Sequence, residues 1–123
     1  MYIRVSGELT YFAWLLLELN KRPAKATILP VEFAILKIIL SEKTSLLIFQ
    51  GDTTRVAICS LLAFYQKIPV GHIEAGLRTN NIYSPFPEEI NRRITSSIAT
   101  FHFAPTKEAA NNLLNEGINK NNI

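Results

Sequence analysis

The sequence predicts an α/β fold in which a parallel β-sheet is flanked by helices. Three short apolar runs, at 45–50, 68–73 and 100–103, are each followed by a longer segment of helical character. Short runs that are apolar at nearly every position are typical of strands buried on both faces. Strands that alternate with helices imply right-handed β–α–β units, in which neighbouring strands run parallel.

Two helices are expected before the first of these strands. The segment 9–19 is apolar on nearly all sides, and Pro23 ends it because proline cannot continue a helix. Pro30 suits the first turn of a second helix over 31–43, where Glu32 lies near the positive end of the helix dipole.

Three more helices are expected among and after the strands, at 53–67, 88–99 and 106–117. In the last of them, Thr106 is a suitable N-cap because its hydroxyl can accept from a free backbone N–H. Gly117 is placed where a helix commonly ends in a left-handed residue. The chain contains no internal repeat and no low-complexity linker.

Length and composition limit the chain to one globular domain at most. Its 123 residues are 48% hydrophobic and 19% charged, with a formal net charge of +3. The cations are scattered, which excludes a nucleic-acid footprint and fits a phosphate-bearing small ligand or a plain solvated surface equally well. No Cys/His cluster has the spacing of a metal site.

The single cysteine, Cys59, excludes an internal disulfide and favours a reducing compartment, so a cytoplasmic protein is expected. Cys59 lies in an apolar helical run, which favours a small buried hydrophobe over a nucleophile. The apolar run at 11–17 is interrupted by Glu18 and is shorter than the roughly 20 residues that span a bilayer. No membrane segment is therefore expected.

Acidic residues accompany two neighbouring strands of the predicted sheet. Asp52 follows the first strand, and Glu74 lies in the second strand or just beyond it. In parallel sheets, ligands bind outside the carboxyl ends of the strands. Thr53 and Thr54 open the next helix there, where free backbone N–H groups favour anions such as phosphate. The topology thus gathers two carboxylates and a phosphate-friendly helix start at one edge.

Each acidic residue also has a purely structural interpretation. Asp52 could cap the helix that starts at Thr53, whereas an unpaired Glu74 within an apolar strand would be costly and so favours a site role. Glu88 and Arg92 are four residues apart on a helix and could form a surface ion pair. The neighbouring pair Glu89 and Arg93 repeats that spacing, so the spacing alone does not choose between them.

Two basic residues near Glu74 are interpreted structurally. His72 is two residues away and points to the same sheet face, but a satisfied core histidine is favoured over a neighbour of the site. Arg78 is interpreted as an anchor for its loop rather than as a substrate contact.

Four motifs, QGDTT, PVGHIEAGLRT, YSPFPEEINRR and HFAPT, together resemble the non-hydrolysing UDP-N-acetylglucosamine 2-epimerase family. The resemblance runs from about Ser45 to Gly117 and more loosely back to Val31. It implies a Rossmann-like sheet that forms part of a two-domain, glycosyltransferase-B-like enzyme. Residues 1–30 do not match the family pattern, 31–123 match part of its amino-terminal domain, and the carboxyl-terminal domain is missing. We therefore expect an incomplete chain that is inactive alone.

The resemblance also implies a reaction. UDP is eliminated from UDP-GlcNAc and adds back after C2 has been protonated on the opposite face, which gives UDP-ManNAc, a step in cell-surface polysaccharide biosynthesis. It assigns three catalytic carboxylates, Asp52, Glu74 and Glu88, and places Arg92 near the substrate. No cofactor or metal is implied, and the expected partners are a UDP-sugar and a second subunit in a homodimer, with self-association of the fragment.

The family's catalytic histidine lies in the missing half, and neither His72 nor His102 replaces it. The hydrolysing 2-epimerases are the alternative enzyme class, but they carry a HIHGGE-like run where this chain has HIEAGL. Two non-enzymatic alternatives stay open. One is a remnant half-domain that binds UDP weakly or not at all, and the other is an interaction module that uses the apolar face of 9–19.

Overall fold

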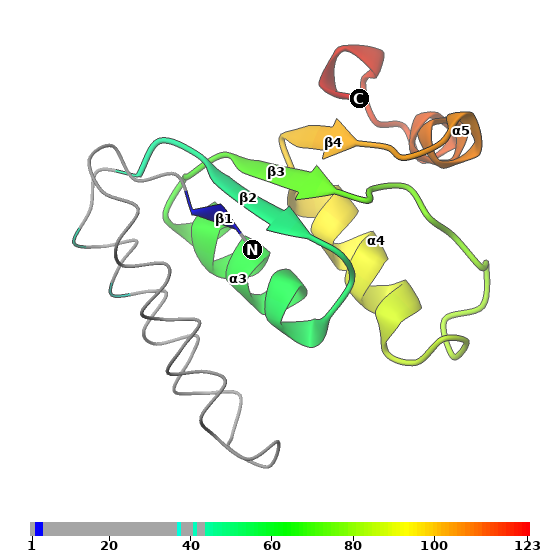
Figure 1. Cartoon of the computed structure of the whole chain (residues 1–123), viewed down its shortest axis with the longest axis horizontal. Coiled ribbons are helices and arrows are strands. Elements are labelled where there is room, and N and C mark those ends of the chain that lie inside the picture. The colour runs from blue at the N-terminus through cyan, green and yellow to red at the C-terminus, as the bar shows by residue number, and fades with distance from the viewer. Residues whose placement is uncertain (1, 4–36, 38–40, 42–43) are drawn as a thin grey trace.

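The computed structural model describes residues 2–3, 37, 41 and 44–123. Its centre is a four-stranded sheet in the order β1-β2-β3-β4, with helices packed beside it (Figure 1). The helices expected at 9–19 and 31–43 lie outside the described residues, apart from Lys37 and Ser41, as does the predicted boundary near residue 30.

Three strands are parallel, as the alternation of strands and helices predicted. They are β2 (Leu47–Gln50), β3 (Val70–Ile73) and β4 (Phe101–Phe103). In register, Phe49 of β2 pairs with His72 of β3, and His72 pairs with His102 of β4. The prediction of an α/β fold with a parallel sheet is confirmed.

The sheet has one strand that the sequence pattern did not predict. β1 (Tyr2–Ile3) pairs antiparallel with β2, so that Tyr2 lies opposite Ile48 and Ile3 opposite Leu47. A pair of residues is too short to show the alternation by which strands are recognised. Residues 2–3 form a strand because they pair with β2, and their own sequence does not indicate one.

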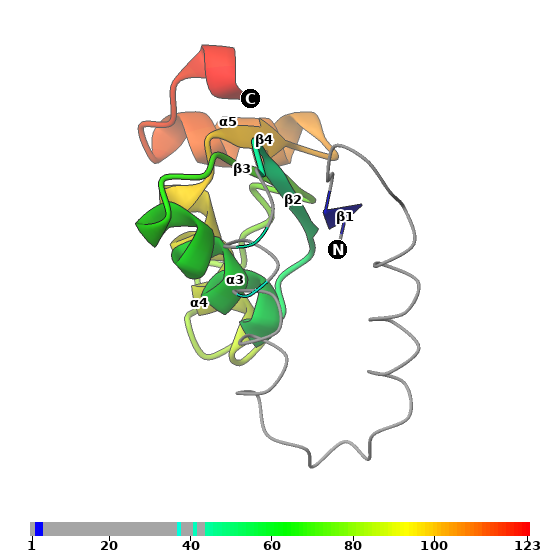
Figure 2. The same cartoon turned by 90° about the vertical axis from the view of Figure 1, so that its left-hand side faces the viewer.

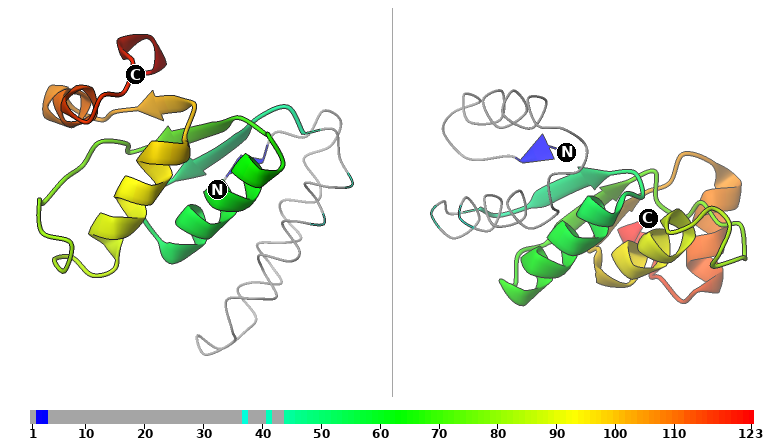
Figure 3. Two further views of the ribbon diagram at one scale, coloured as in Figure 1. Left: turned by 180° about the vertical axis from the view of Figure 1, so that it is seen from behind. Right: turned by 90° about the horizontal axis from the view of Figure 1, so that it is seen from below.

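Two helices cover one face of the sheet. α3 (Thr54–Tyr65) connects β2 to β3, and α4 (Glu88–Ile98) precedes β4. Both lie on the same side of the strands, as the view from below shows (Figure 3). α5 (Lys107–Asn115) follows β4, and a short 3₁₀ turn, η1 (Lys120–Asn122), comes after it. Figure 2 shows α5 beside β4 at the edge of the sheet opposite β1.

Local capping sets where the helices begin and end. The hydroxyl of Thr53 accepts from the N–H of Val56, so Thr53, not Asp52, caps α3. The hydroxyl of Thr106 accepts from the N–H of Ala109, and Gly117 adopts a φ of 85° just after the C-cap of α5. The predictions for Thr106 and Gly117 are confirmed, because both depend only on adjacent backbone groups.

The buried part of the described structure contains polar as well as apolar side chains. Its apolar residues include Leu47, Phe49 and Cys59, all fully buried, so Cys59 is the small buried residue that was predicted. The buried polar residues in the described part of the chain are Ser60, His72, Glu89, Asn91, Thr95, Ser96 and His102. Buried polar groups are costly unless they are paired, so this buried part depends on hydrogen bonds.

The turn after β3 is packed tightly against α5. Gly76 has a φ of +84°, and a Cβ there would overlap the carbonyl of Ala109 and lie 2.9 Å from Cγ of Leu113. Asn112 donates to the carbonyl of Gly76 over 2.9 Å. Only glycine fits this position, because both the backbone conformation and the lack of space exclude a side chain.

No described helix has the length and apolar character that are needed to cross a bilayer.

Candidate active site

The candidate site lies at the carboxyl edge of the sheet, where β2 and β3 end side by side. Gly51 follows β2 with a φ of 85°, and its N–H donates to the carbonyl of Ile73 over 3.2 Å. The side-chain amide of Gln50 donates through Nε2 to Oε1 of Glu74 over 3.2 Å. A Cβ on Gly51 would lie 3.7 Å from Oε2 of Glu74. The structure therefore brings the Glu74 carboxylate to the turn that carries Asp52.

Glu74 lies one residue beyond its strand, so the second of its two predicted placements is the observed one. β3 ends at Ile73, and the N–H groups of Glu74 and Ala75 both donate to the carbonyl of Phe103, over 3.1 and 3.2 Å. Glu74 is exposed and has a φ of 68°, in the left-handed region. Such a conformation costs about 1–3 kcal/mol in a residue other than glycine and is frequent at functional sites.

Asp52 is held by Arg92 of α4. Nε and Nη2 of Arg92 donate to Oδ2 of Asp52 over 2.9 and 2.7 Å. Nη1 of the same guanidinium donates to Oε2 of Glu89 over 3.3 Å. The Arg92 side chain is only 12% exposed, whereas that of Asp52 is 30% exposed. Arg92 thus bridges two carboxylates, and Asp52 keeps one side open to solvent.

The two adjacent glutamates of α4 occupy different environments. Glu88 opens the helix, is half-buried and takes part in none of the four ion pairs of the described residues. Glu89 is fully buried and forms ion pairs with both Arg92 and Arg93, at 3.3 and 3.1 Å. The structural ion pair is therefore the Glu89–Arg93 pair, not the Glu88–Arg92 pair that has the same spacing.

Glu89 has a structural role for which its spacing from Arg93 was only one of two equal candidates in the sequence. The available signal was that Glu89 is spaced three and four residues from two arginines. Burial by itself would raise the pKa of the Glu89 carboxyl, but the N–H of Thr79 and the guanidinium of Arg93 outweigh it and lower that pKa. Glu89 is therefore a fixed anion that organises arginines, and it is unsuited to donating a proton.

His72 supports the same turn from inside the sheet. It is fully buried, and its Nε2 lies 2.8 Å from the carbonyl of Gly51. A carbonyl oxygen can only accept, so Nε2 donates. Burial lowers the pKa of His72, which keeps the imidazole neutral at pH 7. The burial of His72 agrees with a core histidine, but the ring is only partly satisfied, because Nδ1 has no hydrogen-bond partner among the described residues. Its Nε2 contacts the residue next to Asp52.

Arg78 anchors the segment that follows Glu74, as its sequence context predicted. Its Nε and Nη2 donate to the two carboxylate oxygens of Glu116, over 2.6 and 2.7 Å. Nη2 also donates to the hydroxyl of Ser96, and Nη1 to the carbonyl of Leu77. The Arg78 side chain is 2% exposed. One arginine thus ties the β3–α4 segment to α4 and to the end of α5.

The arrangement is suited to proton transfer at a ligand bound over the sheet edge. Glu74 is exposed, and Asp52 and Glu88 are partly exposed, whereas the neighbouring Glu89 is buried. Positioned carboxylates that reach solvent or a ligand can accept or donate a proton during a reaction. Among the described residues, no group of three or more His, Cys, Asp or Glu side chains is placed to hold a metal ion.

Comparison with known proteins gives one consistent family. The model of the UDP-N-acetylglucosamine 2-epimerase family matches residues 15–123. The UDP-N-acetylglucosamine 2-epimerase of Neisseria meningitidis is 62% identical over 76 residues, which cover 62% of this chain and 20% of the relative. The family model therefore matches from residue 15, well before the first of the four sequence motifs, which begins at Gln50.

Solved structures show the same likeness. UDP-GlcNAc 2-epimerase from Neisseria meningitidis, bound to UDP-GlcNAc, superposes with a TM-score of 0.74 at 46% identity, over 85% of this chain and 29% of that one. The enzyme from Methanocaldococcus jannaschii, in complex with UDP-GlcNAc and UDP, gives a TM-score of 0.70 at 47% identity, over 75% of this chain and 25% of that one. The chain therefore spans between a fifth and three-tenths of the length of these relatives.

The Arg78–Glu116 pair makes a testable contribution to stability. Arg78 donates to Glu116 and thereby lowers the pKa of that carboxyl. A lowered pKa in the folded state means that the contribution is present above the unfolded pKa and is lost as pH falls through the folded pKa. We expect Glu116→Gln to reduce the free energy of unfolding by about 1.5–3 kcal/mol at pH 7, the range for hydrogen bonds to charged groups.

Urea unfolding of the chain at pH 7, 5 and 3 measures this effect, and the difference between Glu116→Gln and the unmodified chain should shrink towards pH 3. The matched control is Glu108→Gln, which removes the same charge from an exposed position on α5. The control should change stability by less than about 1 kcal/mol. Equal effects of the two variants at every pH would contradict a specific role for the pair.

Proposed function

This chain belongs to the UDP-N-acetylglucosamine 2-epimerase family, and on that premise we propose that it supplies the strand-end carboxylates for non-hydrolysing epimerisation of UDP-GlcNAc at C2. The observation that carries the proposal is the convergence of Asp52 and Glu74 on one turn at the carboxyl edge of the sheet. The family relatives from Neisseria meningitidis and Methanocaldococcus jannaschii have been solved with UDP-GlcNAc bound, which supports a UDP-sugar as the ligand.

The proposed reaction has two balanced stages. First, a base takes the proton from C2 while the C1–O bond breaks and its electron pair leaves with UDP, so that a C1=C2 double bond forms. Next, an acid delivers a proton to the opposite face of C2, and an oxygen of UDP bonds again to C1. Asp52, Glu74 and Glu88 are proposed to bind and exchange these protons, because each carries an accessible carboxylate.

Arg92 is proposed to act near the substrate through Asp52, since its guanidinium is held by two carboxylates. The run HIEAGL supports the non-hydrolysing subtype over the hydrolysing one. The single Cys59 fits a reducing compartment, and we propose the cytoplasm as the location.

A chimera tests whether these carboxylates act in the reaction. Residues 45–117 of this chain would replace the corresponding segment of the Neisseria meningitidis enzyme, and proton NMR would follow the conversion of UDP-GlcNAc to UDP-ManNAc. We expect the chimera to turn over. Asp52→Asn, Glu74→Gln and Glu88→Gln should each lower kcat by about 10²–10⁴-fold, the usual contribution of a general acid or base. Calorimetry should show that UDP-GlcNAc still binds.

The matched control in this chimera is Glu108→Gln, which removes a carboxylate from exposed α5 and should leave kcat within about 3-fold. Near-normal turnover of all three site variants would contradict the assignment. A folded chimera without activity, when it carries the native carboxylates, would show that this segment does not supply a competent site.

The second expectation is that a polypeptide of only these 123 residues does not epimerise UDP-GlcNAc. The relatives are several times longer, since the chain covers 20% of the Neisseria meningitidis enzyme. A cleft between two domains would take contacts from both, and one wall alone leaves the carboxylates facing water. Holding the reactants in the right geometry can lower the activation barrier by roughly 7–11 kcal/mol, and a single wall of the cleft provides much less of this lowering.

Proton NMR in deuterated water measures this directly. The purified chain should leave the C2 proton of UDP-GlcNAc in place, whereas deuterium at C2 or accumulation of UDP-ManNAc would contradict the expectation. Binding of UDP without turnover would favour the alternative of a nucleotide-binding half-domain.

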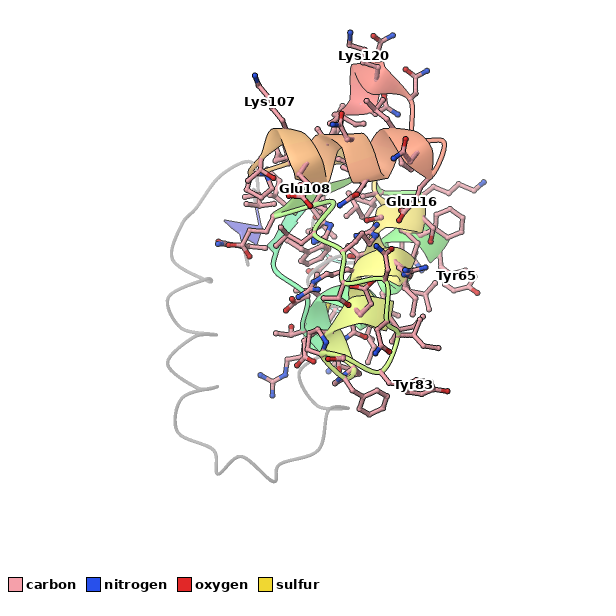
Figure 4. The ribbon with its side chains drawn as sticks, turned by 90° about the vertical axis from the view of Figure 1, so that its right-hand side faces the viewer. Tyr65, Tyr83, Lys107, Glu108, Glu116 and Lys120 are labelled. Atoms are coloured by element: carbon pink, nitrogen blue, oxygen red, sulfur yellow. The ribbon has the colours of Figure 1, made fainter. Side chains whose placement is uncertain are left out.

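A homodimer is proposed through the exposed apolar side of α3 and α4. Ile90 and Ile94 are one turn apart on α4 and are 37% and 39% exposed, and Tyr65 at the end of α3 is 70% exposed. Tyr83 and Phe86, whose ring centroids are 6.4 Å apart, extend this surface along the preceding loop. In Figure 4 the labelled Tyr65 and Tyr83 both project beyond α4 toward the right-hand edge of the picture. Exposed large apolar side chains on neighbouring elements favour an interface, and a second copy would match them symmetrically.

Sedimentation velocity of the chain tests this surface. The unmodified chain should sediment as a dimer at micromolar concentration, and Ile94→Glu should shift it to a monomer. The matched control is Leu114→Glu, because Leu114 is 40% exposed on α5, away from this surface. A monomeric unmodified chain, or a dimer that survives Ile94→Glu, would contradict the proposal.

A further inference from the structure

Two buried side chains hold consecutive carbonyl groups of the turn that carries Asp52. Nε2 of His72, on β3, donates to the carbonyl of Gly51 over 2.8 Å. Nδ2 of Asn91, on α4, donates to the carbonyl of Asp52 over 2.9 Å and lies 3.4 Å from the hydroxyl of Thr54. Both side chains are buried, with His72 fully covered and Asn91 5% exposed.

The carbonyl groups of this turn require hydrogen-bond donors from outside the strand ladder. β2 ends at Gln50, and Gly51 turns the chain with a φ of 85°, so the next carbonyls point away from the strand ladder. Backbone carbonyls that leave a ladder in a protein interior need a donor from elsewhere. His72 and Asn91 supply donors from the neighbouring strand and from the helix above it. The turn is thus fixed from two different elements.

α4 holds the main chain and the side chain of Asp52 through two successive residues, Asn91 and Arg92. Asn91 binds its main-chain carbonyl, and Arg92 binds its carboxylate at 2.7 and 2.9 Å. Main chain and side chain are therefore set by one rigid helix. A shift of the main chain would move the carboxylate relative to Glu74, which lies against Gly51 on the neighbouring strand end.

We propose that Asn91 and His72 are positioning residues for the reaction, because they hold the Gly51–Asp52 main chain that places the Asp52 carboxylate at the sheet edge where Glu74 lies against Gly51. This inference rests on the proposed function. Neither side chain needs to touch the substrate, since both are buried beneath the turn. Misplacing a reacting group by about 1 Å can cost about 100-fold in rate, so the loss of either donor should appear in kcat.

The chimera described above measures the effect on the reaction. Asn91→Leu keeps the approximate volume and removes the donor, and we expect kcat to fall by about 10–100-fold while KM for UDP-GlcNAc stays within about 3-fold. The matched control is Thr95→Val, which removes the buried hydrogen bond of 2.8 Å from the Thr95 hydroxyl to the main-chain carbonyl of Asn91 but leaves the Asn91 side-chain donor in place. Thr95→Val should leave kcat per folded molecule within about 3-fold.

His72 offers a rescue that separates positioning from packing. His72→Phe fills the site without a donor and should lower kcat as Asn91→Leu does. His72→Gln retains an N–H donor and should recover at least part of the loss. Equal kcat values for the Phe and Gln variants, or unchanged kcat in Asn91→Leu, would overturn the proposal.

Amide hydrogen exchange of the 123-residue chain gives a readout that does not depend on activity. Asn91→Leu should accelerate exchange of the Gly51 N–H, which donates to Ile73, by at least about 10-fold. The N–H of Ala110, which donates to Thr106 on α5, should exchange as before. Uniform acceleration at both amides, or none at Gly51, would overturn the role in the turn.

The two measurements separate this inference from the proposed function. If the unmodified chimera is inactive but exchange at Gly51 responds selectively, the proposed function fails and the hold on the turn is supported. If the chimera is active and Asn91→Leu changes neither kcat nor exchange at Gly51, the positioning role fails and the proposed function stands.

Discussion

The bridge from Arg92 to Asp52 and Glu89 is the interaction on which the rest of this structure depends. Its guanidinium is nearly buried, so it needs both carboxylates to replace the water that it has lost. The bridge joins the end of β2 to the first turns of α4, which are separated by forty residues of sequence. Because Glu89 also binds Arg93 and the N–H of Thr79, the bridge extends into the loop before α4.

A second constraint acts on the other side of the candidate site. Glu74 is held in a left-handed conformation between a strand whose last residue is Ile73 and a glycine that packs directly on α5. Arg78 then ties the same segment to α4 and to Glu116. The exposed carboxylate of Glu74 is thus carried by backbone that is fixed on both sides, which is how a surface group keeps a reproducible position.

The two constraints explain the placement of four of the buried polar residues among those described. His72 and Asn91 hold the turn of Asp52, while Glu89 and Ser96 receive bonds from arginines that hold the surrounding segments. A purely apolar layer could stabilise the same sheet, but it could not donate to the carbonyls of a turn. The polar interior is therefore an expected consequence of building accessible carboxylates on a β–α turn.

Features with local causes were determined by the sequence alone. The parallel strands follow from short apolar runs that alternate with helices, and the limits of α5 follow from Thr106 and Gly117, whose partners are adjacent backbone groups. The four motifs were sufficient to indicate the family. Only the tertiary structure decided that Glu89, not Glu88, is buried and that Glu74 lies beyond its strand. It also decided that Tyr2–Ile3 pairs with β2 and that the Asn91 side chain binds the carbonyl of Asp52. The physical reason is that local spacing cannot distinguish such residues, since Glu88 and Glu89 each precede an arginine by four positions. Which residue becomes buried or paired depends on the segments, distant in sequence, that pack against it.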